Sequence, residues 1–262
     1  MSLAVTVGTG GLAGWNILKR TADSQRQAVA KDPVVARAID YTRDRIATAD
    51  ADTLVGDYRM LSVALGAFGL EDDIGNKAFI RKVLESDRSD DKSLVNRLSD
   101  KRYRRLADAL QLDNGLEKVS APGFADKLAG LYVEREFERR VGAGDENLRL
   151  ALNARRELVA LSKRESSEKT LWYEVMGNPP LRKLFETAFG FGTHYAKLPI
   201  DRQLQEFMSR ADQVLGTTSF KGYDTEQGSE KLIRTFLVRA QLAETAVSQS
   251  PYSNALTLLR GY

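Results

Sequence analysis

A short helical pattern that ends in glycine occurs twice in this chain, and it limits the fold more than any other feature. Apolar runs at residues 60–70 and 181–192 both have helical spacing, and both break at glycine. A shorter copy at residues 103–112 comes before another turn signal. Glycine at such a break allows the left-handed backbone that commonly closes a helix. We therefore predict helix stops at four glycines, namely Gly66, Gly69, Gly190 and Gly192.

The rest of the chain also has helical periodicity. A first helix is expected from Trp15 to about Lys31, followed by one that Asp32 caps and Pro33 opens. A single helix should begin at Asp50 or Asp52 and run to the first glycine stop. Strand signals are nearly absent. The sequence predicts an all-α, multihelical fold with internal duplication of a glycine-terminated helix-turn-helix unit, its further helices lying at 76–86, 92–98, 101–110, 122–140, 145–163, 168–176, 178–190, 200–214 and 226–248.

The small residues Gly142, Ala143 and Gly144 separate the two main copies of the pattern. Three residues make too short a linker for freely moving domains, so we expect the two halves to pack as one domain. The predicted organisation is a flexible glycine-rich leader, a first helical half, a second helical half and a tail, at residues 1–14, 15–141, 145–249 and 250–262.

Composition excludes several classes of protein. The 39 basic and 36 acidic residues leave a formal charge of +3, too small and too mixed to favour nucleic acid or anionic lipid. The absence of cysteine excludes disulfides and zinc-thiolate sites. No apolar stretch approaches the roughly 20 residues that cross a bilayer, so membrane insertion is not expected. Lys19 and Arg20 follow the apolar start of the chain instead of preceding it, which argues against a cleaved secretory signal.

A glycine-rich motif at residues 8–13 matches G-x-G-x-x-A, the dinucleotide-binding fingerprint. That fingerprint works inside a βαβ unit whose second strand ends in an acid. Here Asp32, Pro33 and another helix follow instead. We therefore interpret the segment as an interaction-competent leader that Trp15 anchors, and we expect no cofactor.

Two other features resemble catalytic or metal sites. His194 is the only histidine, and no nucleophile or second histidine has a spacing that pairs with it. Acid clusters at 71–73, 90–91 and 145–146 contain the oxygen ligands that calcium and magnesium prefer, but none matches a calcium-binding loop. Each cluster lies near a predicted helix start, where a carboxylate caps the helix. We expect no catalytic residue and no metal site.

Residues 101–105 place a tyrosine among four cations, a composition typical of nucleic-acid surfaces. Asp100 and Asp108 interleave with these cations, while Leu106 and Leu110 occupy one face for packing. We therefore expect a solvated, ion-paired helix face and no nucleic-acid partner.

The central segment at residues 57–86, followed by residues 98–103, strongly resembles an uncharacterised family of helical proteins from alphaproteobacteria. Residues 10–15 and 18–21 near the start and 250–254 near the end are also similar to this family. The resemblance implies a multihelical fold with internal duplication, and genes that tend to lie among flagellar genes. The family brings no catalytic residues, and gene neighbourhood supplies no mechanism.

The leading hypothesis is a non-enzymatic structural or accessory protein that acts by protein-protein interaction. Its expected partners are other proteins, flagellar components among them, or a second copy of itself. We expect a cytoplasmic location, with export to the flagellum without a cleaved signal peptide as the alternative. The candidate interaction residues are apolar side chains near the two chain ends, namely Trp15, Leu256, Leu258 and Leu259.

A second hypothesis is an enzyme or small-ligand receptor with an aromatic-lined cleft between the helical halves. Aromatic side chains around a cleft hold apolar ligands, but aromatic residues at helical spacing more often form a core. The residues expected to line this cleft are Trp172, Tyr173, Phe189, Phe191 and Tyr195.

Overall fold

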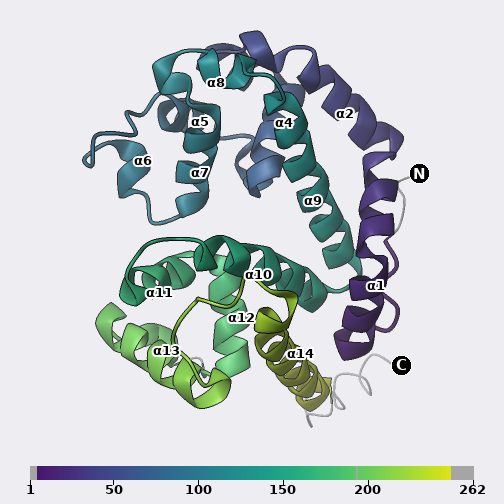
Figure 1. The fold of residues 1–262 in the computed structure, drawn as a ribbon, viewed down its shortest axis with the longest axis vertical. Helices are drawn as coiled ribbons and strands as arrows, with labels where there is room; N and C mark the ends of the chain where they lie inside the picture. Colours follow the sequence, from purple (N-terminus) through teal and green to yellow (C-terminus); the bar gives the residue numbers. More distant parts are fainter. Residues whose placement is uncertain (1–4, 193, 249–262) are drawn as a thin grey trace, which may run out of the picture. The chain divides into compact units, whose positions relative to one another are not determined.

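A computed structural model describes residues 5–192 and 194–248. Fourteen α-helices and four short 3-10 helices form the regular structure of these residues, and no strand occurs among them. The all-α prediction is confirmed. The described chain divides into two compact units, residues 5–6 with 19–140 and residues 7–18 with 141–248. Helices α1 (Gly11–Ala30) and α9 (Phe124–Gly144) each pass from one unit into the other (Figure 1).

Unit 1 also holds seven whole α-helices and three 3-10 helices. These are α2 (Pro33–Arg43), η1 (Ile46–Thr48), α3 (Ala51–Gly56), α4 (Tyr58–Phe68), η2 (Glu71–Asp73), α5 (Lys77–Leu84), α6 (Leu94–Arg97), α7 (Lys101–Leu110), η3 (Leu112–Asn114) and α8 (Glu117–Ser120). Unit 2 holds α10 (Glu146–Ser162), α11 (Glu168–Gly177), α12 (Pro179–Phe189), η4 (Tyr195–Lys197), α13 (Ile200–Leu215) and α14 (Glu226–Ser248).

Helix α4 lies at the centre of unit 1. Eight of its 11 residues are buried, and it packs against α2, α3 and α7. Tyr132 of α9 lies beside Gly66 in the same helix. A helix that is apolar on nearly all sides is stable only when neighbouring elements cover it on nearly all sides. The apolar run at 60–70 is therefore the sequence of a central helix.

In unit 2, helices α10, α12 and α14 pack against one another, and α11 and α13 pack against α12. Phe207 of α13 stands at the centre of an aromatic cluster, with ring centroids 5.3 to 6.3 Å from those of its neighbours. Dispersion and ring-edge contacts in such clusters add to the free energy of burial. The neighbours of Phe207 are Trp172, Phe185, Phe189, Phe191 and Tyr195.

Three of the residues expected to line an aromatic cleft between the helical halves lie in the core of unit 2. Trp172, Phe189 and Tyr195 are buried in the core of unit 2, because their helical spacing points them at α13. Tyr173 is exposed instead, and its hydroxyl donates to Asp201 at 2.6 Å.

Two of the four glycines expected to stop helices do so. Gly69 (φ 71°) ends α4 and Gly190 (φ 70°) ends α12, both in the left-handed region. In each case the glycine N–H bonds to the carbonyl three residues back, and the next N–H bonds to the carbonyl five residues back. This is the Schellman arrangement, which satisfies carbonyls that the helix end leaves free.

The other two glycines do not stop a helix. Gly66 lies inside α4, where its missing side chain makes room for the ring of Tyr132. Gly192 follows the end of α12 and does not have a positive φ. The left-handed residue after α7 is also not a glycine, because Gln111 (φ 53°) takes that position.

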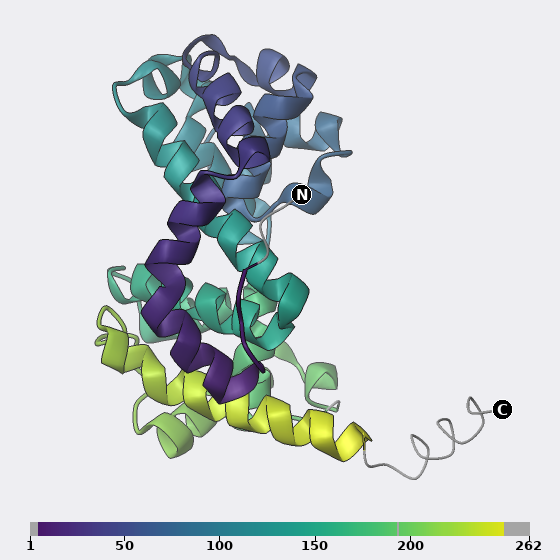
Figure 2. The same ribbon diagram turned by 90° about the vertical axis from the view of Figure 1, so that its right-hand side faces the viewer.

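Two helix boundaries differ from the prediction. The helix expected from Asp50 to the first glycine stop is two helices, because the Asp57 carboxylate accepts the N–H groups of Arg59 and Met60 and starts α4 anew. Helix α1 begins at Gly11 and not at Trp15, so residues 11–14 form its first turn and are not part of a flexible leader. Figure 2 shows this first turn close to α14.

The duplication itself stays a prediction. Helices α4 and α12 share their length of 11 residues, a side-chain cap at the start and a left-handed glycine at the end. These are common local solutions to starting and ending a helix, so they do not by themselves require a common origin.

None of the helices in the described chain combines the length and the apolar character needed to span a membrane.

We expect Gly190→Ala to lower the free energy of unfolding by about 1–2 kcal/mol, because an L-residue pays that amount in the left-handed region. Gly192→Ala is the matched control two residues away, since an added Cβ there would meet no atom within 4 Å. Its effect should stay within about 0.5 kcal/mol. Urea unfolding of both variants measures the difference, and equal stability would contradict the assigned helix end.

Candidate functional site

The glycine-rich motif at the start of the chain makes an internal contact. The Asp145 carboxylate accepts the N–H of Gly11 at 3.1 Å and the N–H of Leu148 at 3.0 Å. One side chain therefore caps the starts of both α1 and α10. A carboxylate of the protein itself occupies the helix start where a dinucleotide fingerprint would place pyrophosphate.

Trp15 is not an exposed interaction residue. Its side chain is only 1% exposed, and its indole N–H donates to Glu230 of α14 at 3.1 Å. The prediction that Trp15 offers a free apolar surface is wrong, because its place on α1 turns it toward α14. The other candidate interaction residues, Leu256, Leu258 and Leu259, lie outside the described residues.

The other polar residues considered as catalytic or metal sites are His194 and the acidic clusters. His194 is exposed at the start of η4. Asp73 accepts hydrogen bonds from the Tyr103 hydroxyl at 2.7 Å and from the Asn76 amide at 2.9 Å. Among the residues that the structure describes, no three histidine or acidic side chains form a group that could hold a metal ion.

The basic run at residues 101–105 is ion-paired along α7. Arg102 pairs with Asp100 at 2.7 Å, and Arg104 pairs with Asp108 at 2.9 Å. The Arg102 guanidinium also donates to the backbone carbonyl of Gly69, at the end of α4. These arginines hold the α7 surface together, as the interleaved acids predict.

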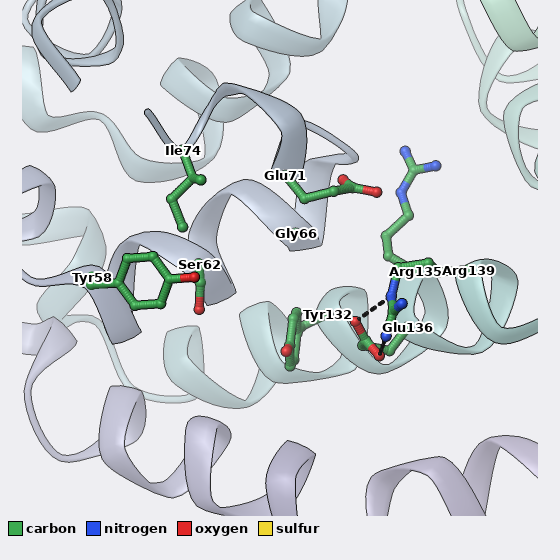
Figure 3. A pocket seen from close by; sticks show the side chains of 9 residues that line it. All are labelled: Tyr58, Ser62, Gly66, Glu71, Ile74, Tyr132, Arg135, Glu136 and Arg139. Carbon is green, nitrogen blue, oxygen red and sulfur yellow. Dashed lines mark hydrogen bonds and ion pairs between the residues drawn. The ribbon is translucent and has the colours of Figure 1, made fainter. Parts of the chain in front are cut away.

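A groove in unit 1 is the candidate site that sequence reasoning missed. It has a volume of about 170 Å³ and lies between α4, η2 and the part of α9 that belongs to this unit. Figure 3 shows its side chains approaching from these three elements. They are Tyr58, Ser62, Gly66, Glu71, Ile74, Tyr132, Arg135, Glu136 and Arg139.

The floor of the groove depends on a close contact between Gly66 and Tyr132. A Cβ built on Gly66 would lie 2.9 Å from Cε2 of the tyrosine ring. Real side chains do not approach so closely, so only glycine lets the ring lie against α4 at this position. Because Gly66 looks like a helix stop in the sequence, this packing role was not apparent.

The charged side chains of the groove are largely paired. Arg139 donates two hydrogen bonds of 2.9 Å to the Glu136 carboxylate, and Arg135 donates to Glu138 at 3.2 Å. The hydrogen bonds that Arg139 donates to Glu136, with a further contribution from the charge of Glu71, raise the pKa of the Arg139 guanidinium above its ordinary value. Two cations and two anions line the groove, so its net charge is close to zero.

Tyr132 offers the groove a hydrogen-bond donor. Its half-buried hydroxyl has no hydrogen-bond partner among the residues that the structure describes. Burial, with help from the nearby Glu136 carboxylate, raises the pKa of Tyr132 to about 12. The phenol therefore stays neutral and able to donate at physiological pH.

Comparison with known proteins identifies the family. Residues 67–221 match a family model whose description is a protein of unknown function, DUF1217. The chain belongs to the DUF1217 family. A protein from Agrobacterium tumefaciens, solved by X-ray crystallography, has a similar fold, with a TM-score of 0.75 and 24% sequence identity over 93% of this chain and 97% of that chain. No curated protein matches the chain.

These findings confirm the resemblance to an uncharacterised family, and the structural neighbour comes from an alphaproteobacterium. The matched region of this DUF1217 member runs from the end of α4 to the loop before α14. It therefore includes Arg135, Glu136 and Arg139 of the groove but not Tyr58 or Ser62.

We expect Gly66→Ala to be less stable than Gly130→Ala by at least about 1 kcal/mol. Both glycines lie inside helices, where alanine gains roughly 0.8–1 kcal/mol of helix propensity. At Gly130 an added Cβ meets nothing, whereas at Gly66 it overlaps the Tyr132 ring and overpacks the contact. Denaturant unfolding of the pair tests the close contact, and a gain of equal size at both positions would refute it.

We expect the stability of the protein to fall less steeply with rising alkalinity in Tyr132→Phe than in the wild type. The pKa of Tyr132 is about 12 when folded and close to 10.0 when unfolded, so the folded state binds more protons between these values. Stability from this group is complete below about pH 10 and is lost as pH rises toward 12. Unfolding curves at several pH values above about 9 measure the two slopes, and parallel slopes would contradict the burial of this phenol.

Proposed function

We propose that this protein is a non-enzymatic helical protein that acts by binding another protein through the groove of unit 1. The observation that carries the proposal is the make-up of the groove, where two tyrosines and two arginines gather around a glycine floor. Tyrosine and arginine are enriched in protein interfaces and among the residues that contribute most to binding. Tyr58 at its edge is 65% exposed, so a large ring stands ready for contact.

The groove suits one apolar side chain of a partner. Its volume of about 170 Å³ is below the roughly 300–1,000 Å³ of pockets that enclose whole small ligands. Its charges nearly cancel, which gives a charged ligand little advantage. The rings of Tyr58 and Tyr132 with Ile74 supply apolar walls. The Tyr132 hydroxyl would then donate to a backbone carbonyl of the partner.

The titratable groups support a binding protein over an enzyme. A general acid or base works best when its pKa lies near the working pH, so enzymes shift carboxylates upward or lysines downward. Thirteen described residues have clear pKa shifts away from neutrality, since the tyrosines and arginines among them have raised pKa values and the carboxylates have lowered ones. These residues are Tyr41, Tyr103, Tyr132, Tyr173, Tyr195, Tyr223, Arg81, Arg102, Arg139, Asp50, Asp57, Asp87 and Glu146.

A flagellar component is the first partner to test. The sequence resembles a family whose genes tend to lie among flagellar genes, which is an association and not a mechanism. A cytoplasmic location and export to the flagellum without a cleaved signal both remain open under this proposal. A second copy of the chain is the other candidate partner.

In living cells, a photo-crosslinking amino acid placed at Tyr58 should form one discrete adduct. Tyr58 is exposed at the edge of the groove, so a bound partner would lie within reach of the probe. Lys118, exposed on α8 of the same unit and not part of the groove, is the control position and should give no adduct. Mass spectrometry of the adduct identifies the partner.

The outcomes separate the alternatives. An adduct at Tyr58 that disappears in Gly66→Ala, which fills the groove floor, supports the docking site. A flagellar protein in that adduct supports the flagellar role, and an adduct with the same chain supports a homo-oligomer. Running the experiment on cells and medium, with and without a working export apparatus, distinguishes the two locations. No adduct at Tyr58, or the same adduct at Lys118, refutes the groove.

A further inference from the structure

A second cleft lies in unit 2, where α13 ends and α14 begins. Its volume is also about 170 Å³. The end of α13, the first turns of α14 and the loop between these helices form its walls. The lining residues are Leu215, Thr217, Lys221, Gly222, Tyr223, Gly228 and Lys231.

The loop that forms the cleft is held in place by α11. The indole N–H of Trp172 donates to the carbonyl of Thr218 at 2.9 Å. The Glu168 carboxylate accepts from the Ser219 hydroxyl at 2.7 Å and from the Phe220 N–H at 3.3 Å. Phe220 is buried against Trp172, with ring centroids 4.8 Å apart. The cleft is therefore preformed, and a ligand would not have to order the loop.

Two glycines bring the start of α14 against this loop. Gly222 has φ 97°, which other residues rarely adopt. A Cβ on Gly228 would overlap the carbonyl of Gly222, so only glycine allows this approach. The Thr225 hydroxyl joins the two, donating to Gly222 and accepting from the Gly228 N–H, both at 3.1 Å.

Tyr223 presents an unsatisfied donor at this cleft. The residue is only 6% exposed, yet its hydroxyl makes no hydrogen bond to any residue within the described ranges. A ligand at the cleft could accept a hydrogen bond from this hydroxyl without displacing a protein group. Burial raises the pKa of Tyr223 to about 12, so the hydroxyl keeps its proton at neutral pH.

The charged groups of the cleft are all cations. Lys231 donates to the carbonyl of Leu215 at 3.1 Å, which leaves its ammonium group two further protons to donate. In the part of the chain that the structure describes, neither Lys221 nor Lys231 forms an ion pair with an acid. None of the seven lining residues is acidic. The N-terminus of α14 adds the partial positive charge of its helix dipole.

We propose that this cleft binds a small phosphate-class oxyanion, held by Lys221 and Lys231 and by a hydrogen bond from the Tyr223 hydroxyl. Lysine ammonium groups act as point charges with freely rotating donors, which suits a tetrahedral phosphate, whereas flat carboxylates are matched best by arginine. Leu215 and the Tyr223 ring provide an apolar wall for the organic part of a phosphate ester. This site belongs to unit 2 and does not depend on the function proposed for the groove of unit 1.

The test is a titration of the full chain with inorganic phosphate at constant ionic strength, followed by calorimetry and by NMR of the backbone amides. Saturable binding with amide shifts at Gly222 and Gly228 is the expected result. Tyr223→Phe keeps the ring and removes only the hydroxyl. The double variant Tyr223→Phe/Lys221→Gln should bind phosphate about tenfold more weakly or worse, since hydrogen bonds to charged groups contribute that much. Lys197→Gln removes an equal charge from an exposed position of unit 2 outside the cleft and should leave the affinity unchanged.

Separate titrations with phenyl phosphate and acetate identify the source of the anion. Tighter binding of phenyl phosphate indicates an ester whose organic part contacts the apolar wall, and tighter binding of inorganic phosphate indicates the free ion. Both results support the site. Acetate binding as tightly as phosphate would overturn the phosphate assignment. Absence of saturable binding, or equal weakening by Lys197→Gln, would mean non-specific attraction to surface lysines and would overturn the site itself.

Discussion

The ends of the helices are the constraint on which the rest of this structure depends. Each helix leaves several backbone N–H and C=O groups without internal partners, and a chain with this many short helices has many such ends to satisfy. Carboxylate, hydroxyl and amide side chains accept the free N–H groups, while left-handed glycines close the carbonyl ends. The capping side chains are Asp32, Asp50, Asp57, Asp100, Asp145, Ser167 and Asn178. Of the acid clusters at 71–73, 90–91 and 145–146, the last supplies such a cap through Asp145, whereas α5 and α6 begin without a side-chain cap, so the capping expected there is wrong.

The Asp145 carboxylate caps two helices whose starts lie far apart in the sequence. It starts α10 beside it in sequence, and it also accepts the N–H of Gly11 more than a hundred residues away. Three glycines near this point, Gly8, Gly10 and Gly11, take positive φ values. The same glycines that imitate a nucleotide fingerprint bring the backbone close enough for this contact. Residues 11–15 are thereby held within unit 2 by this hydrogen bond and by the burial of Trp15.

The fold class and most helices followed from the sequence because periodicity and caps are local signals. Helix α14 has the predicted bounds, and Asp32 caps α2 as expected. The predictions that failed depended on which helices pack together, and the sequence does not show this. Gly66 and Gly69 are indistinguishable by composition, and only the approach of α9 makes one a packing contact and the other a helix end. The groove was missed for the same reason, since its side chains come from residues 58–74 and 132–139, which the sequence does not place together.

The two clefts have the same volume of about 170 Å³, but the charges of the first nearly cancel while those of the second are positive, and this difference decides what each can hold. In the groove of unit 1, Glu136 binds Arg139, so bringing in a charged ligand would break an existing pair. An apolar side chain breaks nothing, and the arginine stems remain available for packing. In the cleft of unit 2, Lys221 and Lys231 form no ion pair that an anion would break, and the Tyr223 hydroxyl has no hydrogen bond to another described residue. An anion there gains attraction from two exposed ammonium groups without displacing a protein carboxylate, which favours binding.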